Sequence, residues 1–109
     1  MQIKKDVKDL KSILGTHQTT VGLNEHGQRV IRYCSTDVVT WDNNTIILNT
    51  GGQETSTTKR RMNEVSEMFK LKFRIFSKNK KWMIEFQDRI FKFHGPVHIL
   101  NRHTTLVVT

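Results

Sequence analysis

Residues 36–52 read TDVVTWDNNTIILNTGG and hold the clearest structural pattern of the chain. Two runs, DVVTW and TIILNT, flank the polar triplet DNN at residues 42–44. β-Branched and aromatic side chains are enriched in strands, and Asn and Asp tolerate the left-handed backbone of tight turns. The stretch therefore predicts a β-hairpin whose second strand ends at the glycine pair.

A helix is expected directly after the glycines. Met62, Val65 and Phe69 follow the i, i+3, i+7 spacing of one helical face. The expected helix covers about residues 57–70 and packs centrally on the sheet. Its N-cap is one of three hydroxyl residues, because such side chains accept hydrogen bonds from free helical N–H groups. These residues are Thr55, Ser56 and Thr57.

Short alternating runs on both sides of the helix extend the β structure. A period of two marks strands with one buried face. The fold class expected is α+β, with an antiparallel sheet of short meandering strands under the central helix. The runs are RVIRYC, LKFRIF, KWMIEF, RIFKF, VHIL and TTLVV, with turns at Lys-Asn-Lys and Gln-Asp. Trp82, Phe86, Phe91 and Phe93 are expected in the core.

The chain ends are interpreted from length and periodicity. The 109 residues fit a single domain, residues 1–109. Apolar residues recur at helical spacing in residues 3–14, which predicts an amphipathic N-terminal helix. Two alternatives stay open for this helix. It packs on the domain, or it acts as a semi-independent partner-binding segment within residues 1–14.

The charge balance points to an acidic partner. There are 18 Lys+Arg against 10 Asp+Glu, so the net charge is +8 and the pI is about 10.0. Nucleic acid is the commonest partner of such a domain, although charge also serves solubility alone. A single cysteine and the lack of long apolar runs predict a protein of a reducing compartment with no membrane contact.

The segment GGQETSTTKRRMN, residues 51–63, raises a specific question about charge. Helix N-termini prefer acidic neighbours, yet this one carries three consecutive cations. Free backbone N–H groups, hydroxyls and cations together make a good phosphate site. The alternative is an ordinary helix cap beside solvated cations. The candidate phosphate-binding residues are Thr57, Thr58, Lys59, Arg60 and Arg61.

A second basic set lies on the later strands. Lys72 and Arg74 share one face of their strand, and Phe73 and Ile75 share the other. Cations and aromatic rings on an exposed sheet face suit single-stranded nucleic acid. Lys72 and Arg74 therefore join the candidate phosphate-binding residues. The alternative is that these aromatic side chains are buried, because the core needs most of the nine aromatic side chains of the chain.

Other chemistry is not indicated by the sequence. His94, His98 and His103 lie near one another in the chain, but no carboxylate or cysteine completes a metal site there. Cys34 has no recognisable catalytic partner and is expected to be a small buried residue. No acid–base pair stands at an interpretable spacing. We therefore expect no enzyme activity, no metal and no cofactor.

Two motifs carry a resemblance to a known group of proteins. The ordered pair LNTGG, residues 48–52, and TTKRRMN, residues 57–63, resembles small proteins encoded by tailed bacteriophages. Their helix start follows the pattern TTKxRMN, and they often carry Trp where Gln53 stands here. The resemblance implies a phage origin and no particular activity. It also implies that the host-cell cytoplasm is the place of action.

Three functions are compatible with these features. The first is a phage accessory protein that binds DNA or RNA through phosphate-backbone contacts. The second is an inhibitor of a host defence complex, CRISPR-type or other, or of a host enzyme, acting on a protein or ribonucleoprotein surface. The third is a component of the virion or of its assembly.

Overall fold

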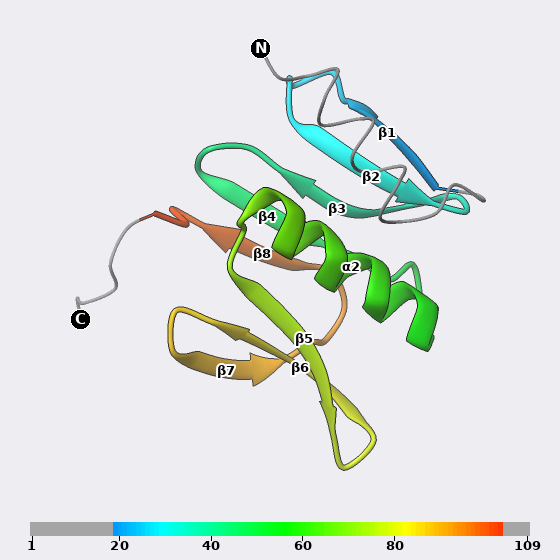
Figure 1. Ribbon diagram of the computed structural model, residues 1–109, viewed down its shortest axis with the longest axis vertical. Coiled ribbons are helices and arrows are strands. Elements are labelled where there is room, and N and C mark those ends of the chain that lie inside the picture. Colours follow the sequence, from blue (N-terminus) through cyan, green and yellow to red (C-terminus); the bar gives the residue numbers. More distant parts are fainter. Residues whose placement is uncertain (1–18, 104–109) are drawn as a thin grey trace.

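A computed structural model describes residues 19–103 of the chain (Figure 1). Within these residues it shows an α+β fold with antiparallel strands and a central helix, as predicted. The expected helix at residues 3–14 and the expected TTLVV strand lie outside them. The elements are β1 (Thr19–Leu23), β2 (Arg29–Tyr33), β3 (Thr36–Trp41), β4 (Thr45–Leu48), α2 (Ser56–Phe69), β5 (Phe73–Lys78), β6 (Lys81–Phe86), β7 (Arg89–Lys92) and β8 (Val97–Leu100).

Five of these strands form one antiparallel sheet in the order β1-β2-β3-β4-β8. The predicted hairpin is confirmed as β3–β4, with Trp41 opposite Ile46. Its turn is closed by the Asp42 carboxylate, which accepts hydrogen bonds from the backbone N–H groups of Asn44 and Thr45, both at 2.8 Å. The hairpin thus forms from local turn chemistry.

The other three strands form a second antiparallel sheet in the order β5-β6-β7. Asn79 and Lys80 join β5 to β6, and Gln87 and Asp88 join β6 to β7. All four residues have positive φ, between 53° and 67°. Two central residues with positive φ give a hairpin turn that matches the twist of the flanking strands. Both predicted turns are confirmed.

The expectation of a single sheet is wrong, because the strands divide into two. Helix α2 interrupts the meander between β4 and β5 and lies along the outer edge of β5, so that edge is not free to pair with another strand. After β7 the chain turns at Gly95, which has φ 65°, and β8 pairs with β4 instead of with β7. Strand periodicity does not specify which strand is the partner.

Both sheets and the helix share one hydrophobic core. Ile31 and Leu48 of the first sheet, Met62 and Val65 of α2 and Ile84 of the second sheet have no exposed surface. The expected core positions are confirmed for Trp82, Phe86 and Phe93, which are buried, and for Phe91, which is partly buried against them.

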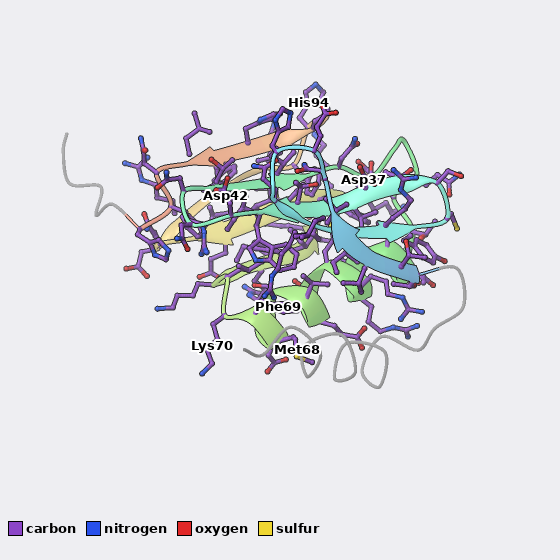
Figure 2. The ribbon with its side chains drawn as sticks, turned by 90° about the horizontal axis from the view of Figure 1, so that it is seen from above. Asp37, Asp42, Met68, Phe69, Lys70 and His94 are labelled. Carbon is purple, nitrogen blue, oxygen red and sulfur yellow. The ribbon has the colours of Figure 1, made fainter. Side chains whose placement is uncertain are left out.

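The helix covers one side of the strands. Seen from above, α2 lies along one side, with Met68, Phe69 and Lys70 at its C-terminal end (Figure 2). His94 lies on the opposite side of the strands in that view. The ring of Phe69 packs on Trp41, with 4.8 Å between ring centroids. The helix is therefore anchored to the first sheet through this end.

Candidate nucleic-acid interface

The hydroxyls and glycines at the helix start have structural roles. Thr55 is the N-cap, and its Oγ1 accepts a hydrogen bond from the backbone N–H of Thr58 at 3.1 Å. The buried hydroxyl of Thr58 lies 3.0 Å from the same oxygen. Gly51 and Gly52 have φ values of 64° and 85°, and a Cβ on Gly51 would collide with the side chain of Thr36. These groups shape the turn into α2.

The three cations at the helix start do not converge on one ligand, because successive helical residues point about 100° apart. Lys59 extends toward the second sheet. Its Nζ donates to Ser77 Oγ at 3.0 Å and lies 5.8 Å from the ring centroid of Trp82. An ammonium at that distance from an indole gains a cation–π attraction. Lys59 thus contributes to packing between α2 and the second sheet.

Arg61 extends the other way, toward the first sheet. Its guanidinium lies 5.7 Å from the ring centroid of Tyr33, and its Nη1 is 3.6 Å from Glu64 Oε1. The side chain of Arg61 is only 13% exposed. Arg60, between the two, is exposed, and Thr57 is half-buried. Of the three cations, Arg60 is the one that faces solvent.

Two polar side chains of α2 bind the outer edge of β5. The amide of Asn63 donates to the carbonyl of Ile75 at 2.9 Å and accepts from its N–H at 2.8 Å. The hydroxyl of Ser66 does the same for Phe73, at 2.7 and 3.0 Å. Edge strands expose unpaired backbone groups, and here the helix satisfies them. Much of the TTKRRMN motif is therefore architectural.

The second sheet has one face toward the core and one toward solvent. Paired residues of antiparallel strands point to the same side, so the register assigns the solvent side directly. We call this side the outer face. Cross-strand neighbours form three rows on the outer face. The first row is Arg74, Glu85 and Ile90, the second is Phe76, Met83 and Lys92, and the third is Lys78 and Lys81.

The outer face combines an apolar centre with a basic rim. Phe76 and Met83 are half-buried, and Ile90 is 59% exposed. Arg74 is held in place by Glu85, with 2.8 Å between Nη2 and Oε1, and its guanidinium lies 4.5 Å from the ring centroid of Phe76. Both side chains of that ion pair remain substantially exposed. The face is open to solvent within the described residues.

Positive charge is concentrated around this sheet. Residues 70–92 carry eight Lys and Arg and only two carboxylates, whereas residues 19–54 carry two cations and four carboxylates. Among the described residues, no ion pair joins the lysines of the outer face to a carboxylate. An imbalance of this size on one side of a small domain attracts anions.

A groove adjoins the outer face where β5 begins. It has a volume of about 550 Å³ and runs between the C-terminal half of α2 and the start of β5. Lys70, Lys72 and Arg74 line it, opposed by Glu67. Lys70 and Lys72 have positive φ values of 56° and 70°, which non-glycine residues seldom adopt. The groove extends the basic surface toward the helix.

The family of the chain follows from a comparison of its sequence. A family model described as Kyanoviridae Gp96 protein matches residues 1–98. The chain belongs to the Kyanoviridae Gp96 protein family. It is a phage protein, which confirms the resemblance drawn from LNTGG and TTKRRMN. Neither a curated protein nor a solved structure shows a significant match.

In this Kyanoviridae family member, the polar residues of the first sheet pair with one another. Arg32 Nε lies 2.7 Å from Asp37 Oδ1, and this hydrogen bond raises the pKa of Arg32. The backbone N–H of Asn44, followed by the Gln28 amide at 3.0 Å, lowers the pKa of the Asp42 carboxyl. Such residues stabilise turns and strand pairs.

Other candidate sites receive no support from the geometry. Within the described residues, no three His, Cys, Asp or Glu side chains lie where they could hold a metal ion. No helix in that part of the chain is long and apolar enough to span a membrane. The expectation that Cys34 is buried is wrong. It is exposed, because it occupies the β2–β3 turn with φ 60°.

The outer face was partly predictable. Phe73 and Ile75 are buried and Arg74 is exposed, as the period of two indicated. The same alternation assigns Phe76 to the face of Arg74, but sequence reasoning did not use this residue. Met83 was also missed, because an apolar residue between Trp82 and Ile84 reads as part of one hydrophobic run.

Proposed function

We propose that this phage protein binds nucleic acid through phosphate-backbone contacts made by the outer face. One observation carries the proposal. Lys78, Lys81 and Lys92 are exposed on that face without a carboxylate partner among the described residues, and its one carboxylate, Glu85, pairs with Arg74. Cations that the fold does not neutralise are available for an external anion.

Phosphate contacts of this kind give affinity without sequence readout. Each neutralised phosphate releases condensed counterions, so the affinity falls steeply with salt concentration. Contacts to the backbone position a protein but carry no base information. The proposed role is therefore that of an accessory protein that acts in the host-cell cytoplasm by binding rather than by catalysis, on DNA or RNA.

We assign the main contacts to the outer face rather than to the helix start. Thr58 is used by the N-cap, and Lys59 and Arg61 lie against aromatic rings. Arg60 remains available at the helix start, beside the half-buried Thr57. Arg60 adds a single positive charge to the contacts with phosphate, whereas the second sheet carries a cluster of positive charges.

The test is fluorescence-anisotropy binding of labelled single- and double-stranded oligonucleotides at several salt concentrations. The variant Lys78→Gln/Lys81→Gln/Lys92→Gln removes three positive charges from the outer face. We expect its affinity to fall, and the slope of log affinity against log salt to shrink by about 2. An unchanged slope would contradict the assignment of these lysines.

A matched control separates local contacts from net charge. The variant Thr20→Glu/Leu23→Glu/Asn43→Glu lowers the net charge by the same amount at exposed positions of β1 and of the β3–β4 turn. If the outer face makes the contacts, this control keeps most of the affinity. Equal losses in both variants would mean that only overall charge matters.

A second candidate function is favoured by one feature, the exposed apolar side chain of Ile90 on the basic face. Apolar centres with charged rims also occur in protein interfaces. We propose, as the alternative, an inhibitor that binds an acidic surface of a host defence or enzyme complex. Affinity purification from host lysate with and without nuclease distinguishes the two. A stoichiometric partner that survives nuclease supports the inhibitor.

A further inference from the structure

Phe76 differs from the other aromatic residues of the protein. The chain has six Phe, two Trp and one Tyr, all within the described residues. Eight of these nine side chains belong to the hydrophobic core or pack against it, and Phe76 does not. Half-buried on a solvent-facing sheet, this ring has no packing role comparable to that of the others. Its position calls for another explanation.

The register places Phe76 among cations. Along β5 it lies between Arg74 and Lys78, each about 7 Å away along the strand. Across the sheet it faces Met83, and Lys92 follows on β7. The apolar side chains of Phe76 and Met83 therefore have Arg74, Lys78 and Lys92 as neighbours on the outer face. That arrangement matches the alternation of bases and phosphates along a nucleic-acid strand.

The contact between Arg74 and Phe76 strengthens this match. The guanidinium lies 4.5 Å from the ring centroid, and its Nη2 is 2.8 Å from Glu85 Oε1. Among the described residues, the other three cation–ring contacts place a cation over Tyr33, Phe69 or Trp82, which are part of the core or packed on it. The pair of Arg74 and Phe76 instead lies on the solvent-exposed outer face of the second sheet.

We infer that the outer face selects single-stranded nucleic acid, with a base stacked on the pair formed by Arg74 and Phe76. This inference rests on the proposed function and specifies its ligand. In a duplex the faces of the bases are already stacked on each other, so a duplex offers the sheet only phosphates. A single strand offers both groups, and stacking on aromatic side chains or guanidinium planes tolerates any base.

The decisive experiment compares one strand alone with the duplex formed by that strand and its complement, using the full chain. Phe76→Leu keeps an apolar side chain but removes the aromatic face. We expect affinity for the single strand to fall by about tenfold to hundredfold, while affinity for the duplex is unchanged. The salt slope should stay the same, because no phosphate contact is lost.

A matched control is Phe69→Leu. Phe69 is also half-buried, and the Arg29 guanidinium lies 5.4 Å from its ring centroid, but it packs on the core at the end of α2. This variant reports any general cost of losing a phenyl ring and should bind the single strand normally. In a third variant, Phe76→Trp, the fluorescence of the added indole should be quenched on binding. Because Trp41 and Trp82 are buried, this change in fluorescence can be assigned to the added indole.

The outcomes separate the two proposals. Loss of single-strand affinity in Phe76→Leu but not in Phe69→Leu, with quenching in Phe76→Trp, supports the inference. Binding that depends on Lys78, Lys81 and Lys92 but not on Phe76 overturns the inference and leaves phosphate binding in place. Equal loss on strand and duplex also overturns it. No binding of either form by the wild-type chain overturns the proposed function itself.

Discussion

The two sheets share one hydrophobic core but differ in how their polar residues are paired. In the first sheet, Asp42 closes the β3–β4 turn and Arg32 pairs with Asp37. In the second sheet, Arg74 pairs with Glu85, but the lysines of the outer face have no such partner among the described residues. Among the described residues, the cation surplus is therefore localised at the second sheet rather than general.

The difference separates residues that maintain the fold from residues that the fold does not require. A charged side chain with an internal partner is explained by turns, caps or strand pairs. A group of cations without one adds self-repulsion to the folded state. The second sheet carries this cost on one face, which is why we propose the function there. Substitutions in the two sheets and in the segments that join them can test this difference.

The largest effect is expected at the link between α2 and the second sheet. Asn63→Leu leaves the N–H and C=O of Ile75 without their partners at a largely covered edge. Each unsatisfied buried group costs about 1–3 kcal/mol, so the free energy of unfolding should fall by about 3 kcal/mol. The melting temperature should drop by more than about 10 °C, as measured by circular dichroism.

The control for Asn63 is Asn43→Leu in the β3–β4 turn. Asn43 is exposed, and its substitution should change the free energy of unfolding by less than about 0.5 kcal/mol. If both variants melted at the same temperature, the second sheet would not depend on the helix for its edge.

The next effect concerns the turn that leaves the first sheet. Gly51→Ala and Gly52→Ala each place a side chain at positive φ, which costs about 1 kcal/mol. Gly51→Ala should cost roughly twice as much, because its Cβ collides with Thr36 whereas the Cβ of Gly52→Ala meets open space. Urea titration measures both differences.

A second substitution tests the cause of that difference. Thr36→Ala removes the colliding side-chain atoms, so it should recover part of the loss in Gly51→Ala and none of the loss in Gly52→Ala. Equal stabilities of the two glycine variants would show that only the backbone conformation matters.

A smaller effect with a defined pH dependence is expected at Asp42. Hydrogen bonds from the N–H of Asn44 and from the Gln28 amide lower its folded pKa. A lowered folded pKa means that the carboxylate stabilises the folded state above the unfolded pKa, about 3.9, and that this stabilisation is lost as the pH falls through the folded pKa.

Asp42→Asn tests this sign. It should reduce the free energy of unfolding by about 1 kcal/mol at pH 7, and the two proteins should converge as the pH falls below about 4. Urea unfolding at a series of pH values measures the difference. A constant gap down to acidic pH would contradict a role for the ionised carboxylate.

The smallest effect distinguishes the cations at the helix start. Lys59→Met removes the contacts to Ser77 and Trp82 and should cost about 0.5 kcal/mol. Arg60→Met, at an exposed neighbouring position, should leave stability unchanged. Thermal melts at matched salt concentration compare the two. A larger loss for Arg60→Met would reverse the structural assignment.

Much of the fold could be predicted because its signals are local. The hairpin at residues 36–50, the helix boundaries and the two tight turns follow from propensity, periodicity and turn residues. The candidate site was less predictable. Lys59, Arg60 and Arg61 are adjacent in sequence, yet they diverge because a helix rotates each residue away from its neighbour. Residues that are adjacent in sequence therefore need not bring their charged groups close together in space.

The element types, the excess of positive charge and the alternation of Phe73, Arg74 and Ile75 between two faces can be derived from the sequence alone, since each depends on composition or on neighbouring residues. Three further features follow from tertiary contacts: β8 pairs with β4, α2 covers the edge of β5, and Phe76 lies outside the core. Those outcomes depend on contacts between residues far apart in the chain, where competing pairings are separated by packing and by the need to satisfy buried backbone groups.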